Sequence, residues 1–462
     1  MAVTKDLKMK KAIQINDKLE NNTNGFNKVI GYESIVNELK QICDVLKNRD
    51  IYEKLGVTIP RGIMLHGDPG LGKTLMAKAF IEEAGWETFT CRKDKPNGDF
   101  VKAIKETFDK AVSASPSIVF LDDMDKFATG RNRNNEDAEE YVAVQSCIDE
   151  ARDKDVFVIA TANDIDDMPD SLLRAGRFDR VIYVNEPSAK DTEKLAEYYI
   201  KQKNFEDDID IASVAHIMGR TSVAEIETLI NYAGLYAGFE RADIITTEHL
   251  MKACLHVLHG VSENSFTKIN KGELSLLDGK LKTIIYHEAG HAALCEILDP
   301  GSVSLCTTYG CGRNGRGPDG LTSYCHSSKW ENTSTEMDEV MLALAGMAAT
   351  DHKLGSPDTG CSEDVSKAVR IIKRAVESNC RYGFGLIHAG APWEGSSQDL
   401  NRMQETVVSA KLEEGLRKAK EILVMNNDFY EAIVEALAEK CILTQKDIKT
   451  IREQFSIVSP AA

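Results

Sequence analysis

The 462-residue sequence predicts two parts in order: an α/β domain with a parallel sheet and a helical lid, then a mainly α-helical domain. As far as Pro187, short apolar runs alternate with helical segments, which is typical of parallel strands joined by helices. Beyond Pro187 the pattern is helical, apart from a glycine-rich stretch that begins near residue 303 and predicts a hairpin or an irregular strand. A chain of this length is expected to hold two or three domains.

Four apolar runs are the expected strands of the parallel sheet: GIMLHG (62–67), SIVFLDD (117–123), VFVIATAN (156–163) and VIYV (181–184). The helical segments between them include KTLMAKAFIEEAG and GDFVKAIKETFDKAV. The pattern divides the chain into five parts: a polar tail (1–25), the α/β part (26–186), the helical lid (187–259), a linker (260–274) and the second domain (275–462).

Composition and charge narrow the class of protein. The residues are 42% hydrophobic and 28% charged, with a net charge of −17, which argues against nucleic acid as the main partner. No stretch approaches the ~20 apolar residues of a membrane-spanning helix, so no membrane segment is expected in this chain. Eleven scattered cysteines without a secretory signal indicate reduced thiols, and we therefore expect a cytoplasmic protein.

The stretch GDPGLGKT follows the first expected strand and opens a helix, in the pattern G-x-x-x-x-G-K-[ST]. Glycines at these positions let backbone N–H groups close on phosphate oxygens, while the lysine reaches the terminal phosphates and the threonine can ligate Mg²⁺. The alternative is a glycine-rich turn that happens to precede a lysine. In this context the pattern predicts a site for ATP and Mg²⁺, formed by Gly67, Asp68, Pro69, Gly70, Leu71, Gly72, Lys73 and Thr74.

Polar residues also end the next two apolar runs. Asp122 and Asp123 close one run and Asn163 closes the other, at the carboxyl ends of strands, where ligands bind in open α/β sheets. Asp122 suits a Mg²⁺ partner, Asp123 is placed to orient the attacking water, and Asn163 could touch the γ-phosphate or that water. One such residue could be a satisfied turn group, but three in register with the phosphate loop indicate a nucleotide site.

The segment RAGRFDR carries two arginines. Arg174 comes eleven residues after Asn163, and Arg177 follows in the same segment. They are either surface arginines or arginine fingers, which reach the γ-phosphate of a neighbouring subunit and stabilise charge in the transition state.

The stretch IIYHEAGHAALCEI (284–297) carries a second pattern, HExxH. His287 and His291 share one face of a helix, so both imidazoles can bind one zinc ion, with the Glu288 carboxylate beside it. A catalytic zinc needs a third protein ligand, which should be a His, Asp or Glu distant in sequence. Chemistry alone leaves several candidates, which include His326, His352, Glu363 and Asp364.

Five segments resemble, in this order, AAA proteases of the FtsH type over roughly residues 26–455: FNKVIGYE, GDPGLGKT, FLDDMD, ATAND…SLLRAGRFDR and HEAGH. The resemblance implies an AAA+ ATPase domain with its lid, then a zinc metallopeptidase domain, assembled as a homo-hexamer that degrades protein or peptide substrates. It implies that Asn163 is sensor 1, and that Arg174 and Arg177 act in trans. The segment DTGCSEDVSKAV resembles the one that delivers the family's third zinc ligand, here Asp364, and Glu288 would be the general base.

The sequence departs from the FtsH pattern in four respects. The family's two transmembrane helices before the ATPase have no counterpart, so this is either a soluble member or a chain whose membrane anchor was removed. Asp123 stands where the family has Glu, and CRKDKPNGDF (91–100), at the family's pore loop, is polar with Phe100 as its one aromatic. The Asp-Gly-Phe signal between subunits is also missing. The polar pore loop and Asp123 favour a rival function, a nucleotide-gated peptidase or chaperone-like ring without processive unfolding, whereas the intact phosphate loop, Asn163 and both arginines favour an active motor.

Two further features belong to the second domain. GPDGLTSY (317–324) resembles the strand at the edge of the family's cleft, and could hold an extended peptide by strand addition. Cys306, Cys311, Cys325 and His326 lie close in sequence, but their spacing is irregular, so buried reduced cysteines are favoured over a second zinc.

Overall fold

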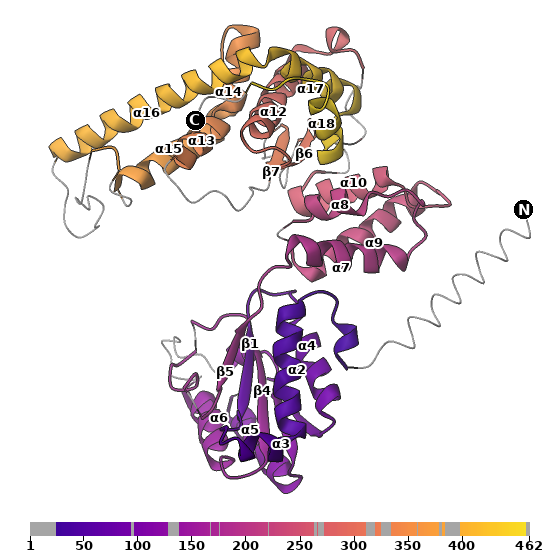
Figure 1. The fold of residues 1–462 in the computed structure, drawn as a ribbon, viewed down its shortest axis with the longest axis vertical. Helices are drawn as coiled ribbons and strands as arrows, with labels where there is room; N and C mark the ends of the chain where they lie inside the picture. The colour runs from indigo at the N-terminus through magenta and orange to yellow at the C-terminus, as the bar shows by residue number, and fades with distance from the viewer. Residues whose placement is uncertain are drawn as a thin grey trace, which may run out of the picture. The chain divides into compact units, whose positions relative to one another are not determined.

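The computed structural model describes residues 25–458 except for the stretches 94–96, 128–137, 167, 175, 220, 263–265, 267–271, 311–318, 325–333, 358, 378–380 and 384–397. Contacts divide the described chain into two compact units (Figure 1). The first holds the residues up to Lys203 together with Gly219–Thr228, and the second holds Asn204–Met218 together with the residues from Leu229 onward. The segment expected as a lid is therefore shared between the two units.

The first unit is built on a parallel sheet of five strands in the order β2-β3-β4-β1-β5. Figure 1 labels its strands β4, β1 and β5. The strands are β1 (Gly62–His66), β2 (Glu87–Cys91), β3 (Ser117–Leu121), β4 (Val156–Ala162) and β5 (Arg180–Tyr183). The predicted parallel sheet is confirmed. The sequence pattern does not predict β2, because its residues ETFTC form no apolar run and only Cys91 is buried.

Helices cover both faces of this sheet. On one face, Ile63 and Leu65 of β1 share a core with α2 and α4, whereas Met64 belongs to the core under α5 and α6 on the other face. Successive residues of β1 thus point to opposite faces, as strand geometry requires, and both faces are buried. The helices of this unit are η1 (Gly25–Lys28), α2 (Glu33–Lys47), α3 (Arg49–Lys54), α4 (Lys73–Ala84), α5 (Asn97–Ser113), η2 (Met124–Lys126), α6 (Ala138–Glu150) and α7 (Ala189–Lys201).

The second unit is mainly helical and carries a small antiparallel sheet in the order β7-β6-β8. The glycine-rich stretch is expected to form a hairpin or an irregular strand, and the antiparallel β6–β7 pair supports the first of these. Helix α9 (Val223–Phe239) begins in the first unit and ends in the second. The other elements are α8 (Ile211–Ile217), α10 (Thr247–His259), η3 (Leu274–Leu276), α12 (Gly279–Leu298), β6 (Val303–Thr307), β7 (Leu321–Tyr324), α13 (Ser334–Ala343), α14 (Ala345–Leu354), η5 (Thr359–Cys361), α15 (Ser362–Glu377), α16 (Gln398–Met425), α17 (Asn427–Lys440), β8 (Ile442–Thr444) and α18 (Gln445–Arg452).

Helix α12 lies in the core of the second unit and is buried without a break from Glu288 to Ile297. Gly290 lets α14 approach it closely, since a Cβ atom on this glycine would lie 2.4 Å from the Cβ atom of Ala349. This packing fixes the helix that carries the HExxH residues. Among the described residues, no helix has both the length and the apolar composition to cross a membrane.

Candidate functional site

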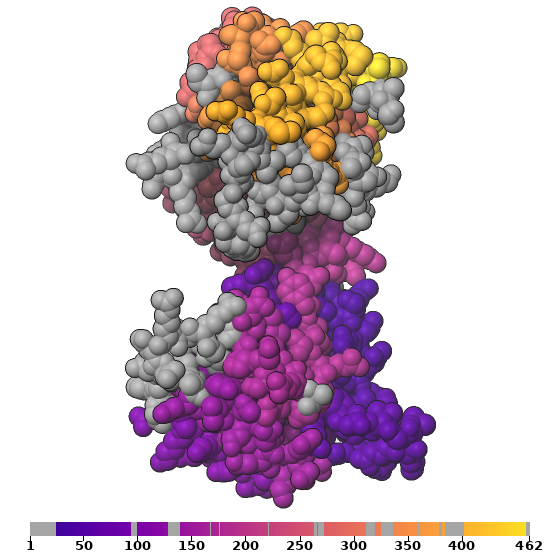
Figure 2. All heavy atoms as spheres, turned by 90° about the vertical axis from the view of Figure 1, so that its left-hand side faces the viewer, coloured from indigo at the N-terminus to yellow at the C-terminus, as the bar shows by residue number. Residues whose placement is uncertain are grey.

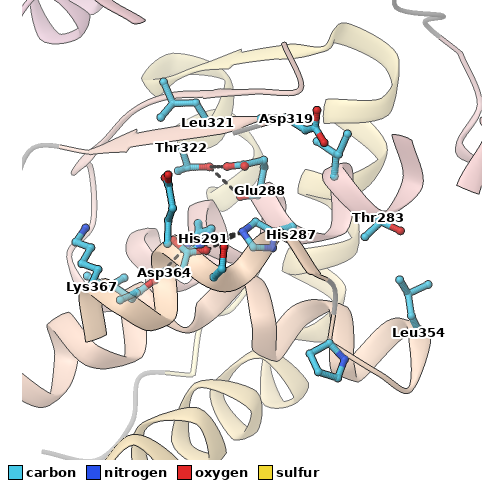
Figure 3. Close-up of a pocket in the computed structure, with 18 of the residues that line it drawn as sticks. Thr283, His287, Glu288, His291, Asp319, Leu321, Thr322, Leu354, Asp364 and Lys367 are labelled. Carbon is cyan, nitrogen blue, oxygen red and sulfur yellow. Dashed lines mark hydrogen bonds and ion pairs between the residues drawn. The ribbon is translucent and has the colours of Figure 1, made fainter. Parts of the chain in front are cut away.

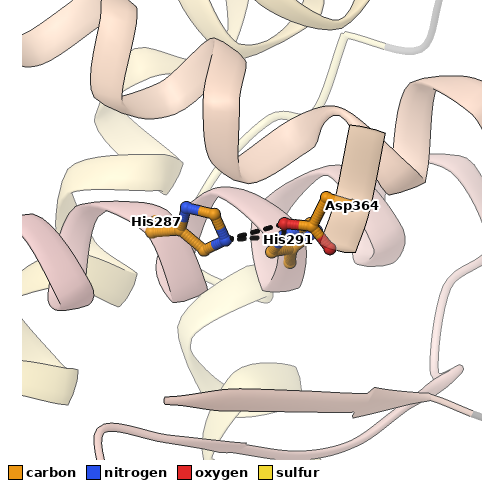
Figure 4. Close-up of side chains that lie close together, drawn as sticks. All are labelled: His287, His291 and Asp364. Atoms are coloured by element: carbon orange, nitrogen blue, oxygen red, sulfur yellow. Dashed lines mark hydrogen bonds and ion pairs between the residues drawn. The ribbon is translucent and has the colours of Figure 1, made fainter. Parts of the chain in front are cut away.

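Helices α12 and α15 bring together the one group of candidate metal ligands found among the described residues (Figure 4). His287 and His291 are one turn apart on α12, and Asp364 lies in the first turn of α15. The Oδ2 atom of Asp364 is 3.0 Å from His287 Nε2 and 3.3 Å from His291 Nε2, and the two Nε2 atoms are 3.1 Å apart. Three donor atoms from two helices thus converge on one point.

These donor atoms fit a zinc ion. His291 Nδ1 lies 2.9 Å from the main-chain oxygen of Leu342, so Nδ1 carries the hydrogen and Nε2 presents its lone pair to the cluster. Two imidazoles and a carboxylate that face one another favour a shared cation. Tetrahedral zinc, with bonds of about 2.0–2.1 Å to nitrogen and oxygen, places its ligand atoms roughly 3.3 Å apart. The spacing in the cluster is close to this value.

The charges of the cluster favour an ionised Asp364. Burial acts to raise the pKa of its carboxyl group, but the hydrogen bonds from His287 and His291 outweigh burial and hold the pKa well below its usual range. The ionised carboxylate is the form that binds a metal.

The other candidates for the third ligand are not in the cluster. His352 Nε2 lies 3.2 Å from the side-chain oxygen of Asn427. Glu363 borders the same cavity but contributes no atom to the group of ligands. His326 lies outside the described residues. Asp364 is therefore the candidate that the structure brings to the histidine pair.

Glu288 lies beside the cluster and is buried, with 6% of its surface exposed. Thr322 on β7 donates a hydrogen bond of 2.8 Å to its Oε2 atom (Figure 3). Burial raises the pKa of the Glu288 carboxyl group, and the nearby His291 and His287 offset part of this rise. A raised pKa suits a carboxylate that has to accept a proton.

A cavity of about 790 Å³ borders the cluster, with α12, β7 and α15 contributing to its walls (Figure 3). Two glycines make room for its key side chains. A Cβ atom on Gly346 would lie 2.4 Å from the His287 ring, and one on Gly320 would lie 2.7 Å from the Cγ atom of Glu288. Gly320 and Thr322 belong to the segment GPDGLTSY, which the sequence places at the edge of the cleft, but the sequence does not predict their contacts with Glu288. No sequence motif identifies Gly346. These contacts join elements that are remote in the chain.

The phosphate loop joins β1 to α4 in the first unit. Gly67, Gly70 and Gly72 have φ angles of 143°, 80° and 89°, a region that favours glycine. A Cβ atom on Gly67 would also lie 2.2 Å from the main-chain oxygen of Val184. The loop leads directly into the amino end of α4, where backbone N–H groups and the helix dipole favour phosphate.

The residues predicted to contact nucleotide meet at the carboxyl edge of the sheet. The buried ammonium group of Lys73 donates to two main-chain oxygens of the loop, at 2.6 and 2.7 Å, and to Asn163 Oδ1 at 2.9 Å. Thr74 Oγ1 donates to Asp122 Oδ1 at 3.1 Å. A lysine, a hydroxyl and a carboxylate in this arrangement fit a nucleotide phosphate and its Mg²⁺.

Comparisons with known proteins agree with both sites. Residues 63–186 match the ATPase family associated with various cellular activities (AAA), and residues 276–451 match peptidase family M41. The "ATP-dependent zinc metalloprotease FtsH" of Caldicellulosiruptor bescii is 31% identical to this chain over 460 residues, covering 92% of this chain and 71% of that protein. The chain belongs to the FtsH family.

Other relatives support the same family. FtsH 2 of a Thermoanaerobacter species is 27% identical and is covered over 83% of its length, and FtsH of Mycoplasma pneumoniae is 29% identical and is covered over 64%. These matches cover 93% and 95% of this chain. FtsH membership confirms the predicted order of an AAA ATPase domain and a zinc metallopeptidase domain, with Zn²⁺, ATP and Mg²⁺ as the cofactors.

The segment at the position of the FtsH pore loop, 91–100, is described except for residues 94–96. Lys93 Nζ lies 3.0 Å from an oxygen of the buried Glu140, so this cation is engaged within the chain. Phe100 is 1% exposed, and its ring packs edge-on against Phe127 with centroids 5.0 Å apart. The one aromatic residue of the segment is thus part of the core.

Asp123, which stands where the FtsH pattern has glutamate, is held by two cations. Its Oδ2 atom accepts hydrogen bonds from Lys126 at 2.6 Å and from Arg92 at 3.2 Å. The hydrogen bond from Lys126 lowers the pKa of Asp123 in spite of burial. The aspartate side chain is one CH₂ shorter than that of glutamate, and these two hydrogen bonds hold it in place. Its carboxylate therefore extends less far toward an attacking water than a glutamate carboxylate would.

Replacing Asp123 by glutamate is expected to raise ATP turnover severalfold, because the longer side chain reaches further toward the attacking water. Asp123→Asn is expected to bind ATP but not to hydrolyse it, since an amide does not accept the proton. Phosphate release measures turnover, and nucleotide analysis of the isolated protein measures bound ATP. A fall in turnover with glutamate would show that the site is built around the shorter side chain.

The two predicted arginine fingers lie between β4 and β5, in different surroundings. Arg174 is exposed. Arg177 forms a bidentate ion pair with Asp149 of α6, with its Nε atom 3.0 Å from Oδ1 and its Nη2 atom 2.7 Å from Oδ2. If Arg177 acts at a neighbouring subunit, its guanidinium therefore has to leave Asp149 and bind a phosphate instead.

Of the cysteines and histidine near the hairpin, Cys306 is described, and Cys311, Cys325 and His326 lie outside the described residues. Cys306 is fully buried, and burial raises the pKa of its thiol. The thiol is therefore protonated at neutral pH and behaves as a small apolar group.

Proposed function

We propose that this FtsH-family chain is a zinc endopeptidase that degrades protein or peptide substrates and is driven by ATP hydrolysis in its first unit. The observation that carries the proposal is the convergence of His287, His291 and Asp364 on one point, beside the buried Glu288. A metal site, a carboxylate base and a substrate-sized cavity in one place are the groups that hydrolysis of a peptide bond requires.

Each side chain has a distinct role in this proposal. The two histidines and Asp364 hold zinc, which when bound polarises the scissile carbonyl and lowers the pKa of the attacking water. Glu288 accepts the proton of that water on its carboxylate and delivers it to the departing amide nitrogen. Its burial limits exchange of this proton with bulk water.

Strand β7 is proposed to hold the substrate. It stands at the edge of the three-stranded sheet, borders the cavity, and its four residues are half-buried. An extended peptide can add to such an edge through main-chain hydrogen bonds, which contribute affinity without demanding a particular sequence. This pairing would lay a scissile bond beside the metal ligands.

In the ATPase site, we assign Lys73 to the terminal phosphates, Thr74 and Asp122 to Mg²⁺, Asp123 to the attacking water and Asn163 to sensing the γ-phosphate. The contacts among these residues support the assignment. The nucleotide-binding subdomain (26–186), lid (187–259), linker (260–274) and peptidase domain (275–462) remain predictions from the sequence, as does a cytoplasmic location.

The proposed assembly is a homo-hexamer, in which Arg174 and Arg177 reach the nucleotide of the adjacent subunit. Arg177→Ala is expected to bind ATP but to hydrolyse it roughly 10³-fold more slowly or worse, the effect typical of losing an arginine finger. Mixing it with Lys73→Ala subunits should restore some hydrolysis, because mixed interfaces combine an intact finger with an intact phosphate loop. Phosphate release from mixed rings tests this, with co-assembly verified by native mass spectrometry. Absence of rescue in verified mixed rings would contradict action in trans.

A second candidate function is a nucleotide-gated peptidase that does not pull on its substrates. The buried Phe100 and the engaged Lys93 favour it, because neither is available to grip a chain. Large apolar side chains grip by burying surface, at ~25 cal/mol per Å², whereas solvated charges hold weakly and are screened by salt.

We expect the protein to degrade unfolded or loosely folded substrates and to do poorly on a stable domain that carries the same tag. Gel-based degradation of a tightly folded reporter and of its destabilised variant measures the difference. Equal ATP-driven rates of degradation for the folded reporter and its destabilised variant would show that the pore holds a substrate firmly enough to unfold it. This result would exclude the gating function.

The proposed function itself is tested by casein degradation in the presence of zinc, with ATP, a non-hydrolysable analogue, or no nucleotide. Degradation that requires hydrolysable ATP supports the proposal. Equal degradation with the analogue supports gating instead. No degradation under any condition, by zinc-loaded protein that hydrolyses ATP, would overturn the peptidase assignment.

A further inference from the structure

Thr322 of β7 and Gly320, the residue just before β7, both lie close to Glu288. The hydroxyl of Thr322 lies 2.8 Å from the Oε2 atom of Glu288 and 3.1 Å from its main-chain oxygen. Two residues earlier, Gly320 has no side chain, and a Cβ atom there would lie 2.9 Å from Oε1 of Glu288 and 2.9 Å from Ile284. The Glu288 side chain therefore lies against the backbone at residue 320. Its Oε2 atom lies at the Thr322 hydroxyl, as Figure 3 shows.

We propose that Thr322 is a positioning residue for the general base, because its hydroxyl fixes Oε2 of Glu288 and leaves Oε1 to accept the proton. This inference rests on the proposed peptidase function. Thr322 touches neither substrate nor metal in this role and acts through Glu288.

The chemistry of the hydroxyl sets the direction of this hydrogen bond. A threonine hydroxyl has a single hydrogen, and an ionised carboxylate is a stronger acceptor than a neutral carbonyl or a thiol. Thr322 Oγ1 also lies 3.4 Å from the Sγ atom of the fully buried Cys306. A thiol sulfur is only a weak acceptor, so the carboxylate of Glu288 is the favoured acceptor of the threonine hydrogen.

Fixing one oxygen matters because a glutamate side chain has three rotatable bonds. Threonine is branched at Cβ and restricted at χ1, so its hydroxyl is itself well placed by the strand. A displacement of about 1 Å at a reacting group can cost 10²-fold in rate. Since β7 is also the strand proposed to bind substrate, one element would position both the base and the scissile bond.

The test compares Thr322→Val, which keeps the shape but removes the hydroxyl, with Thr322→Ser, which keeps the hydroxyl. We expect kcat for peptide cleavage to fall roughly 10–100-fold in the valine variant and to be largely retained in the serine variant, with KM and zinc content unchanged. The valine variant should also bind a peptide hydroxamate more weakly in calorimetry, since the hydroxamate places a hydrogen-bond donor at Glu288. Thr308→Val is the matched control, because the hydroxyl of Thr308 is buried and has no partner among the described residues.

A double-mutant cycle separates positioning from a general effect on the fold. If Thr322 acts through Glu288, adding Thr322→Val to Glu288→Gln should lower cleavage little further. Three results would overturn the inference. The effects of Thr322→Val and Glu288→Gln on cleavage could be fully additive, the serine and valine variants could lose cleavage equally, or the valine variant could change only KM or only zinc content. If the wild type cleaves peptide and the valine variant cleaves it equally well, this inference fails and the proposed function stands. If the wild type does not cleave peptide, the proposed function and the inference both fail.

Discussion

Replacing Asp364 by alanine is expected to remove zinc from the peptidase site and to abolish peptide cleavage. The two histidines that remain supply two of the three protein ligands of a catalytic zinc. Loss of an outer partner of a ligand costs about 10–100-fold in metal affinity, and loss of the ligand itself should cost more. Metal analysis after dialysis, together with a cleavage assay with and without added zinc, measures both effects.

Glu363→Ala is the matched control for this prediction. Glu363 precedes Asp364 on α15 and borders the same cavity, but it contributes no atom to the group of ligands. The control should keep its zinc, and treatment of the wild type with a chelator should reproduce the Asp364→Ala result. Full zinc and normal cleavage in Asp364→Ala would place the third ligand elsewhere, with Glu363 as the next candidate.

The parts of the sites that lie within one short segment could be predicted from the sequence. The phosphate loop needs a strand, a turn with positive φ angles and a helix in immediate succession. In the sequence, an apolar run, the spacing of the glycines and the helical segment that follows indicate these three parts. The HExxH pair needs only helical periodicity. The third ligand is different, because Asp364 is 73 residues from His291 along the chain. Chemistry alone leaves several candidates, and only the resemblance to FtsH proteases selects Asp364 from the sequence.

The features that the sequence could not predict are contacts between separate elements. Strand β2 is an edge strand with little burial, so hydrophobic pattern does not identify it. The ion pair of Arg177 with Asp149 joins a loop to α6, and the hydrogen bond of Thr322 with Glu288 joins β7 to α12. No spacing rule connects such residues, because their proximity results from the packing of the whole unit.

Replacing Glu288 by glutamine is expected to lower peptide cleavage by roughly 10²–10⁴-fold or more, the range typical of a general base. Glutamine has nearly the same shape, and its amide oxygen can still accept the hydrogen bond from Thr322, but an amide does not take a proton from the attacking water. Zinc content and ATP turnover should persist, because the metal ligands and the nucleotide site are unchanged. Peptide cleavage, metal analysis and phosphate release measure the three quantities.

Glu296→Gln controls for the loss of a buried negative charge from α12. Glu296 is 3% exposed on the same helix, and burial raises the pKa of its carboxyl group as it does for Glu288. Its Oε2 atom accepts a hydrogen bond of 2.9 Å from the main-chain N–H of Gly301, and it does not border the cavity. The control should cleave peptide at close to the wild-type rate, so that a loss specific to Glu288→Gln reports on proton transfer and not on the charge of the helix. Normal proteolysis by a zinc-loaded Glu288→Gln protein would remove Glu288 from the mechanism, and the role proposed for Thr322 would be lost with it.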